Sequence, residues 1–273
     1  MNYSFVKDPR GYYRCDPIPS KAELDRLYTD EFYTTAKPRY LERQEDDIRW
    51  WNEMYQDRLN VLEEINLGHK MLDIGCGGGF FLRKAAYSPN RAWDCFGVEP
   101  NEVAREYAMN FNPYSWLSHS LDVMPRDFNA IHLSEVLEHV PDPFQMLSDC
   151  RDRLLPGGAI CVVVPNEKIE NGTLVYPHVF APPQHINYFD FDSIADLMRL
   201  AGFKIVERSA MYPMETFLQM GLDYTKSEAI GRLCHHQRMA FDLSMTSVQR
   251  RKFYRELAEH KLGRECCIYG VKK

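Results

Sequence analysis

The sequence predicts an α/β fold in which a parallel sheet is covered by helices on both faces. Three observations predict it: apolar strand-like runs alternate with amphipathic stretches, the connecting loops are short, and a glycine-rich turn follows the first core run. The 273 residues are 45% hydrophobic and 26% charged, which suits one large domain or a domain with an insertion. The net charge of −6 disfavours a broad nucleic-acid-binding face.

The expected elements follow one another in a regular order. Ser20 opens a short helical signal in a region rich in tyrosine, proline and charge. The stretch 45–69 then predicts a long amphipathic helix, in which apolar residues recur at helical spacing from Ile48 to Ile65 and which Gly68 ends. Residues 212–262 then interrupt the alternation with a helical stretch. Strands are expected at 70–75, 95–100, 115–120, 129–134, 159–165, 203–210 and 265–273.

Four segments are therefore expected: an N-terminal arm or lid (1–45), a core (46–211), a helical insertion that caps the acceptor pocket (212–262) and the last core strand (263–273). The eight cysteines include no CxxC pair, so we expect small buried side chains in a reducing compartment. The chain begins without an apolar signal region, and no apolar run approaches membrane-spanning length. We expect a cytoplasmic protein without a membrane segment.

The glycine-rich turn LDIGCGGGF lies where the first core strand should pass into its helix. Gly75 and the three glycines after Cys76 have no Cβ, so a ligand can approach backbone amides at a helix N-terminus. Asp73 precedes the first glycine by two positions, and Glu99 ends the second strand in GVEP. An acidic side chain at that second position accepts hydrogen bonds from the vicinal hydroxyls of a ribose.

Taken in order, LDIGCGGG, GVEP, NAIHLSEVLEHVPDP and LLPGG resemble the class I S-adenosylmethionine-dependent methyltransferases, over residues 68–210 and the last strand. The resemblance implies a Rossmann-like seven-stranded sheet with an antiparallel last strand, and S-adenosylmethionine as cofactor. It implies that the cofactor is contacted by the glycine-rich turn and by residues at the ends of the second, third and fourth strands. The residues are Asp73, Gly75, Cys76 and Gly77 at the amino-acid end, Glu99 at the ribose, Ser120 and Leu121 at the adenine, and Ser134 near the sulfonium.

The stretch SEVLEHVPDP, residues 134–143, places Glu135, Glu138 and His139 between an apolar strand and two prolines. On a helix, positions i, i+3 and i+4 share one face, so the three polar groups would project into one small volume. Such a cluster is a metal site, an acid/base cluster, or only the polar start of a helix that seats the cofactor.

Two features favour a divalent cation. Glu135 completes an E-x-x-E-H pattern similar to that of ubiquinone-pathway and small-RNA O-methyltransferases, where these positions are associated with a cation beside the acceptor hydroxyl. His185, in the loop after the fifth strand, matches a further histidine of the RNA enzymes. Without metal, His185 or His139 would act as the general base, with Glu138 beside them. The expected metal ligands are Glu135, Glu138, His139 and His185, for Mn²⁺, Zn²⁺, Fe²⁺ or, less naturally, Mg²⁺.

The segments outside the shared core should select the acceptor. Residues 11–33 are similar to the lead-in of bacterial methyltransferases of surface-sugar and secondary-metabolite pathways. The resemblance therefore implies O-methylation of a small polar molecule: a sugar, a nucleotide sugar or a glycan precursor. Tyr28 and Tyr33 are candidates for a lid over the cofactor.

In the insertion, Arg232, His235 and His236 form either a clamp for an anionic acceptor or a solvated polar face. Two alternatives to O-methylation stay open: metal-independent methylation at carbon or nitrogen, and a cofactor-binding subunit that does not catalyse. An RNA acceptor is disfavoured by the acidic chain.

Overall fold

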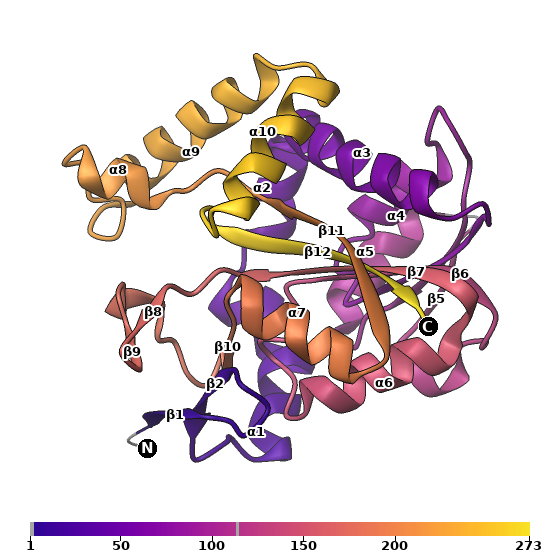
Figure 1. Ribbon diagram of the computed structural model, residues 1–273, viewed down its shortest axis with the longest axis horizontal. Helices are drawn as coiled ribbons and strands as arrows, with labels where there is room; N and C mark the ends of the chain where they lie inside the picture. Colours follow the sequence, from indigo (N-terminus) through magenta and orange to yellow (C-terminus); the bar gives the residue numbers. More distant parts are fainter. Residues whose placement is uncertain (1–2, 113–114) are drawn as a thin grey trace.

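The computed structural model describes residues 3–112 and 115–273, and a seven-stranded sheet runs through its centre (Figure 1). Its strands are β3 (Lys70–Ile74), β4 (Asp94–Val98), β5 (Trp116–Ser118), β6 (Phe128–Ser134), β7 (Leu154–Pro165), β11 (Phe203–Ala210) and β12 (Glu265–Lys272). Their order is β11-β12-β7-β6-β3-β4-β5. Strands β3 to β7 run parallel, whereas β12 is antiparallel to both β7 and β11. The predicted fold class, including the antiparallel last strand, is confirmed.

Helices cover both faces of the sheet because alternate strand residues point to opposite sides. On β3, Met71 packs toward one hydrophobic cluster and Leu72 toward the other. Helices α3 (Ile48–Ile65) and α4 (Phe80–Ala86) belong to the first cluster, and α6 (Pro143–Arg153) and α7 (Phe191–Leu200) to the second (Figure 1). Helix α5 (Glu102–Phe111) follows β4.

The N-terminal arm docks on the loop that follows β7. Strands β1 (Ser4–Lys7), β2 (Tyr13–Asp16) and β10 (Asn187–Tyr188) form a separate three-stranded sheet. Ser20 caps α1 (Lys21–Asp25), as predicted, and η1 (Arg26–Ala36) continues it as a π-helix, followed by α2 (Tyr40–Asp46). The pairing of β10 with β2 holds the arm next to the carboxyl end of β7.

Residues 212–262 form α8 (Glu215–Gln219), α9 (Glu228–Leu243) and α10 (Ser247–Glu259), and α9 and α10 contact α3. Asp242 is fully buried and accepts hydrogen bonds from the Trp50 indole N–H, at 2.8 Å, and from the Tyr254 hydroxyl. Arg250 is also buried and donates to Asp57 on α3. The insertion is therefore fastened to the core by buried polar contacts.

The shorter elements are β8 (Ile169–Glu170), β9 (Thr173–Leu174), and the single turns η2 (Leu121–Val123) and η3 (Pro177–Val179). All eight cysteines are free and buried, so the expectation of small core side chains is confirmed. Over the two described ranges, none of the helices has the length and apolar character that crossing a bilayer requires.

Candidate functional site

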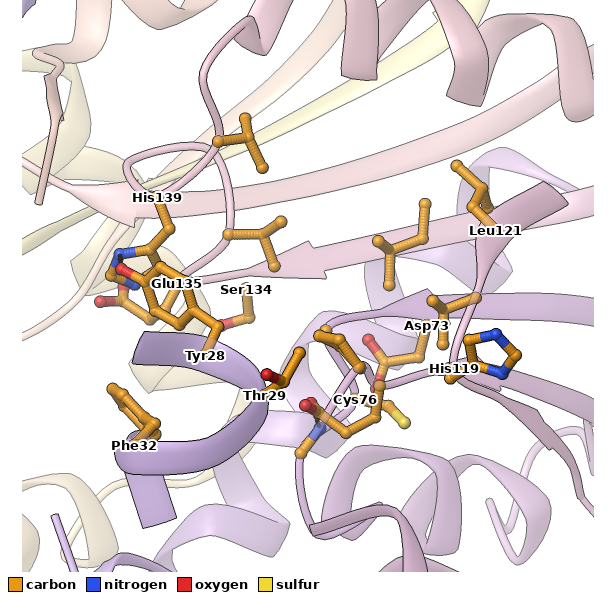
Figure 2. Close-up of a pocket in the computed structure, with 18 of the residues that line it drawn as sticks. Tyr28, Thr29, Phe32, Asp73, Cys76, His119, Leu121, Ser134, Glu135 and His139 are labelled. Carbon is orange, nitrogen blue, oxygen red and sulfur yellow. Dashed lines mark hydrogen bonds between the residues drawn. The ribbon is translucent and has the colours of Figure 1, made fainter. Parts of the chain in front are cut away.

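A cavity of about 800 Å³ opens at the carboxyl ends of β3, β4 and β6, the edge at which ligands bind in sheets of this kind. Figure 2 shows Tyr28, Thr29 and Phe32 of η1 on one side of it, with His139 at one end and His119 at the other. The eight residues expected to contact the cofactor all line this cavity: Asp73, Gly75, Cys76, Gly77, Glu99, Ser120, Leu121 and Ser134.

The glycine-rich turn forms a backbone cradle at the start of α4. Gly75 has a φ of +70°, and a Cβ there would lie 2.6 Å from a methyl carbon of Val136. Gly77 has a φ of +52°, again in the left-handed region that favours glycine. The N–H groups of Gly75 and Cys76 donate to the Val98 carbonyl, which fixes the turn over the end of β4. A side chain at Gly75 would therefore force the turn or Val136 to move.

Glu99 is a buried carboxylate at the end of β4, with 6% of its surface exposed. Its two oxygens accept the N–H groups of Gly77 and Asn101, each at 2.9 Å. Burial raises the pKa of Glu99 to about 7, although these two hydrogen bonds lower it. Each oxygen keeps a lone pair for a further donor. The group therefore fits the vicinal hydroxyls of a ribose.

His132, which the sequence analysis did not single out, also lines the cavity. Its Nδ1 lies 2.7 Å from Oδ1 of Asp73, and its ring stacks on Phe81 with a centroid distance of 3.8 Å. Burial lowers the pKa of His132, which opposes the effect of the neighbouring carboxylate. The signal was present in the sequence, because a histidine in the middle of the apolar run NAIHLS needs a polar partner.

The predicted helix face in EVLEH is wrong. Glu135 has a φ of +57°, and a turn follows in which the His139 N–H donates to the Val136 carbonyl. Helix α6 begins only at Pro143, with the Asp142 side chain accepting two N–H groups of its first turn. A proline fits the first position of a helix and disfavours helical backbone in the residue before it. A turn between strand and helix, not a helix face, therefore carries Glu138 and His139.

Three of the four expected metal ligands converge. Ligand atoms of Glu138, His139 and His185 all lie within 4.8 Å of one another, a group that does not include Glu135. The N–H groups of Ile186 and Asn187 donate to the Glu138 carbonyl at 2.8 and 3.1 Å. The Asn187 side chain donates to two further carbonyls of the turn. These contacts bring the loop with His185 against the turn that carries the other two side chains.

The two histidines of this cluster are neutral. His139 Nδ1 lies 2.7 Å from the Gln184 carbonyl, which only accepts, so Nδ1 carries the proton and Nε2 presents a lone pair. Burial lowers the pKa of His139 to about 4 and that of His185 to about 3. Both oxygens of Glu138 are buried without a hydrogen-bond donor. Neutral imidazoles offer lone pairs to a divalent cation, whereas the Glu138 carboxyl group would have to lose its proton on binding one.

Glu135 and Glu138 are two acids of the same turn, and the pKa values of both are raised. Glu135 lines the cavity. Desolvation, followed by the charge of Glu265, raises the pKa of Glu135 to about 8. Burial, followed by the charge of Glu135, raises the pKa of Glu138 well above its ordinary value. Two neighbouring carboxyl groups with raised pKa values indicate a place that stabilises added positive charge.

The candidate anion clamp of the insertion is occupied by its own chain. His235 Nε2 lies 2.8 Å from an Asp47 oxygen, and Arg232 lies 3.4 Å from the same oxygen. A further contact joins Arg232 to His236 at 3.2 Å. Among the residues described, none from 212–262 lines the cavity. The clamp is therefore a packing contact with the start of α3, and the role of the insertion as a cap stays a prediction.

Tyr28 and Tyr33 lie where a lid would. Both line the cavity from η1, and the Tyr28 hydroxyl donates to the Gln184 carbonyl and lies 2.7 Å from His139 Nδ1. The Asn101 side chain donates to the carbonyls of Tyr28 and Thr29, which ties η1 to the start of α5. Helix η1 thus contacts both the start of α5, next to Glu99, and the histidine end of the cavity.

The fold and the cavity define a class I S-adenosylmethionine-dependent methyltransferase domain, with S-adenosylmethionine as the methyl donor of that class. Residues 40–208 match the model of a methyltransferase domain family, so the chain belongs to that family.

Comparison with known proteins agrees with this assignment. The ubiquinone biosynthesis O-methyltransferase of Vibrio cholerae is 30% identical over 141 residues, which make up 45% of this chain and 58% of that protein. The enzyme of that name from Proteus mirabilis is 29% identical over 51% of this chain and 60% of its own. The chain thus spans a little over half the length of these curated relatives.

Solved structures share the fold at low identity. A putative sarcosine dimethylglycine methyltransferase from Galdieria sulphuraria superposes with a TM-score of 0.57 at 13% identity, over 81% of this chain and 85% of its own. The [4+2]-cyclase SpnF superposes with a TM-score of 0.51 at 18% identity, over 79% and 81%. Because one of the two is named as a cyclase, the fold by itself does not fix the reaction.

Proposed function

We propose that this protein transfers a methyl group from S-adenosylmethionine to a hydroxyl oxygen of a small molecule, beside a divalent cation held by Glu138, His139 and His185. One observation carries the proposal: the three side chains converge next to the cavity, and the Glu138 carboxyl group is 1% exposed there, with the Glu135 carboxyl group beside it. The name of the curated relatives, O-methyltransferase, supports oxygen as the accepting atom.

The residues present fit a cation better than a general base. With pKa values of about 4 and about 3, His139 and His185 are too weakly basic to remove a proton from a hydroxyl near neutral pH. A divalent cation at this cluster would lower the pKa of an acceptor hydroxyl and orient its oxygen. Two imidazoles and a carboxylate favour Mn²⁺, Fe²⁺ or Zn²⁺ over Mg²⁺.

The cavity wall bears on the choice of acceptor. Tyr40, Trp51 and Tyr55 line it, and Trp51 stacks on Tyr55 with a centroid distance of 5.4 Å. Such a wall accepts the flat face of a ring, and the nearby carboxyl groups accept hydroxyl donors. A sugar, a nucleotide sugar or a glycan precursor is therefore our first acceptor class.

Metal binding and methyl transfer are tested separately. Protein stripped with chelator is titrated with Mn²⁺ and Zn²⁺ in a calorimeter, and the His185→Ala variant is compared with His260→Ala, which removes an exposed histidine at the end of α10. We expect about one cation per chain in the wild type and in His260→Ala, and a loss of affinity of at least tenfold in His185→Ala. Equal affinity in all three proteins would reject the cation site.

Transfer is measured with methyl-labelled S-adenosylmethionine against a panel of nucleotide sugars, free sugars and catechols. The position of the label in the product, read by NMR, distinguishes an O-methyl group from an N- or C-methyl group. Methylation at nitrogen or carbon that persists after chelation would favour the metal-independent alternative. Binding of S-adenosylmethionine without transfer to any acceptor class would favour the non-catalytic subunit.

A further inference from the structure

Three polar side chains form a buried chain that runs from α3 to the cavity. Arg58 of α3 is 5% exposed, His132 of β6 is 2% exposed and Asp73 of β3 is 3% exposed. Arg58 Nη1 lies 3.4 Å from His132 Nε2, and His132 Nδ1 lies 2.7 Å from Asp73 Oδ1. Burying such groups is unfavourable unless they satisfy one another.

The register of the sheet creates the contact between the two inner members. Asp73 and His132 are direct partners on the adjacent parallel strands β3 and β6, so both side chains project from the same face. Phe81 of α4 stacks on the imidazole with an interplanar angle of 19°. The ring is thereby held in one plane, with Nδ1 toward the carboxylate.

The donor inventory fixes the direction of the hydrogen bonds. A guanidinium group only donates, so His132 Nε2 accepts from Arg58 and Nδ1 carries the proton. Nδ1–H then donates to Asp73, which uses Oδ1 and leaves Oδ2 for a ligand in the cavity. Arg58 is held in turn by Ser134 Oγ at 3.2 Å and by Glu265 at 3.7 Å.

We infer that Arg58 and His132 are positioning residues that hold the Asp73 carboxylate toward the ammonium group at the amino-acid end of the cofactor. This inference rests on the proposed function, since it requires S-adenosylmethionine in the cavity. A free aspartate side chain would rotate between several positions, and fixing it before the ligand arrives removes that entropy cost from binding. His132 thus acts on the cofactor through Asp73.

Two ligands separate this role from a merely structural one. S-adenosylhomocysteine carries the amino-acid end, whereas 5′-methylthioadenosine keeps the adenine and ribose and lacks it. We compare His132→Phe, which keeps a ring against Phe81 and loses the donor, with His132→Asn, which keeps a donor near the position of Nδ1. Both ligands are titrated into each variant by calorimetry.

We expect His132→Phe to weaken S-adenosylhomocysteine about tenfold and to leave 5′-methylthioadenosine unchanged, because only the former reaches Asp73. His132→Asn should retain most of the affinity. In an Asp73→Asn background, His132→Phe should cause no further loss. Equal weakening of both ligands, or no weakening of either, overturns the inference. A wild-type protein that binds neither ligand would instead reject the cofactor assignment itself.

A measurement on the wild type covers the case in which His132→Phe does not fold. Nitrogen NMR of the imidazole distinguishes a protonated Nδ1 from a protonated Nε2. The structure assigns the proton to Nδ1 of His132, in a slowly exchanging hydrogen bond. Observation of the Nε2–H tautomer would show that His132 does not accept from Arg58 and donate to Asp73, and would reject the inference.

Discussion

Replacing Glu99 with glutamine gives a sharp test of how the ribose end of the cavity works. The carboxylate is almost fully buried, it accepts two backbone N–H groups, and burial raises its pKa to about 7. Hydroxyl donors stabilise the ionised form, so a ligand with a ribose should bind the ionised protein better. The binding of S-adenosylhomocysteine should therefore strengthen as the pH rises through 7.

The magnitude follows from the pKa. A group that titrates near 7 is about 10% ionised at pH 6 and about 90% ionised at pH 8, so the dissociation constant should fall about tenfold over that range. Glu99→Gln does not titrate. Its amide has one oxygen in place of two, so an acceptor for a ribose hydroxyl is lost and binding should weaken by about 1–3 kcal/mol at pH 8.

Calorimetric titration of S-adenosylhomocysteine at pH 6, 7 and 8 measures both effects. Glu102→Gln, an exposed acid in the first turn of α5, is the matched control and should behave as the wild type. The ligand's amino group and Glu135 titrate in the wild type and in Glu99→Gln alike. The difference between the pH profiles of these two proteins therefore reports on Glu99 alone. If Glu99→Gln kept the wild-type slope, the carboxylate would not be the group that receives the ribose.

The same shift predicts the pH dependence of stability. The folded-state pKa of Glu99, about 7, lies above the ordinary value of 4.5, so the empty folded protein binds more protons than the unfolded chain between those two pH values. The free energy of unfolding should therefore fall as the pH rises through that window, and saturating ligand should remove most of this trend. Urea unfolding of the wild type and of Glu99→Gln, with and without ligand, measures it.

Two further predictions concern the insertion and the turn. Asp242→Ala should lower the free energy of unfolding by about 2–5 kcal/mol, because it strands the Trp50 indole and a buried tyrosine hydroxyl; in urea unfolding, the exposed Asp196→Ala should change it by less than about 1 kcal/mol. Gly75→Ala should weaken S-adenosylhomocysteine at least tenfold, because its Cβ would clash at a φ of +70°. Undiminished calorimetric affinity of this variant would contradict the geometry assigned to the turn.

The cofactor side of the molecule could be predicted from the sequence because its signals are local. A glycine-rich turn and an acid at a strand end can each be recognised from a few consecutive residues. A parallel sheet then brings the carboxyl ends of its strands to one edge. The eight residues expected around the cofactor accordingly line one cavity. The capping role of Ser20 was equally local, because Glu23, three residues further on, completes its capping box.

The arrangement of the polar side chains around Glu138 and on α9 depends on contacts between segments that are distant in the sequence. Helical spacing predicted one face for Glu135, Glu138 and His139. The helix α6 begins only at Pro143, however, and these three residues lie in a turn before it. Arg232 and His235 of α9 contact Asp47, and no sequence motif predicts this partner.

The pairing of Asp73 with His132 depends on the register between β3 and β6, which lie far apart in the chain. The approach of His185 to Glu138 depends on backbone hydrogen bonds that join the loop after β7 to the turn after β6. Composition and periodicity along the sequence determined which elements form, because those preferences act over a few residues. Register and loop contacts are fixed only when the sheet and its two hydrophobic clusters assemble, and for that reason the tertiary structure alone decided which polar groups meet.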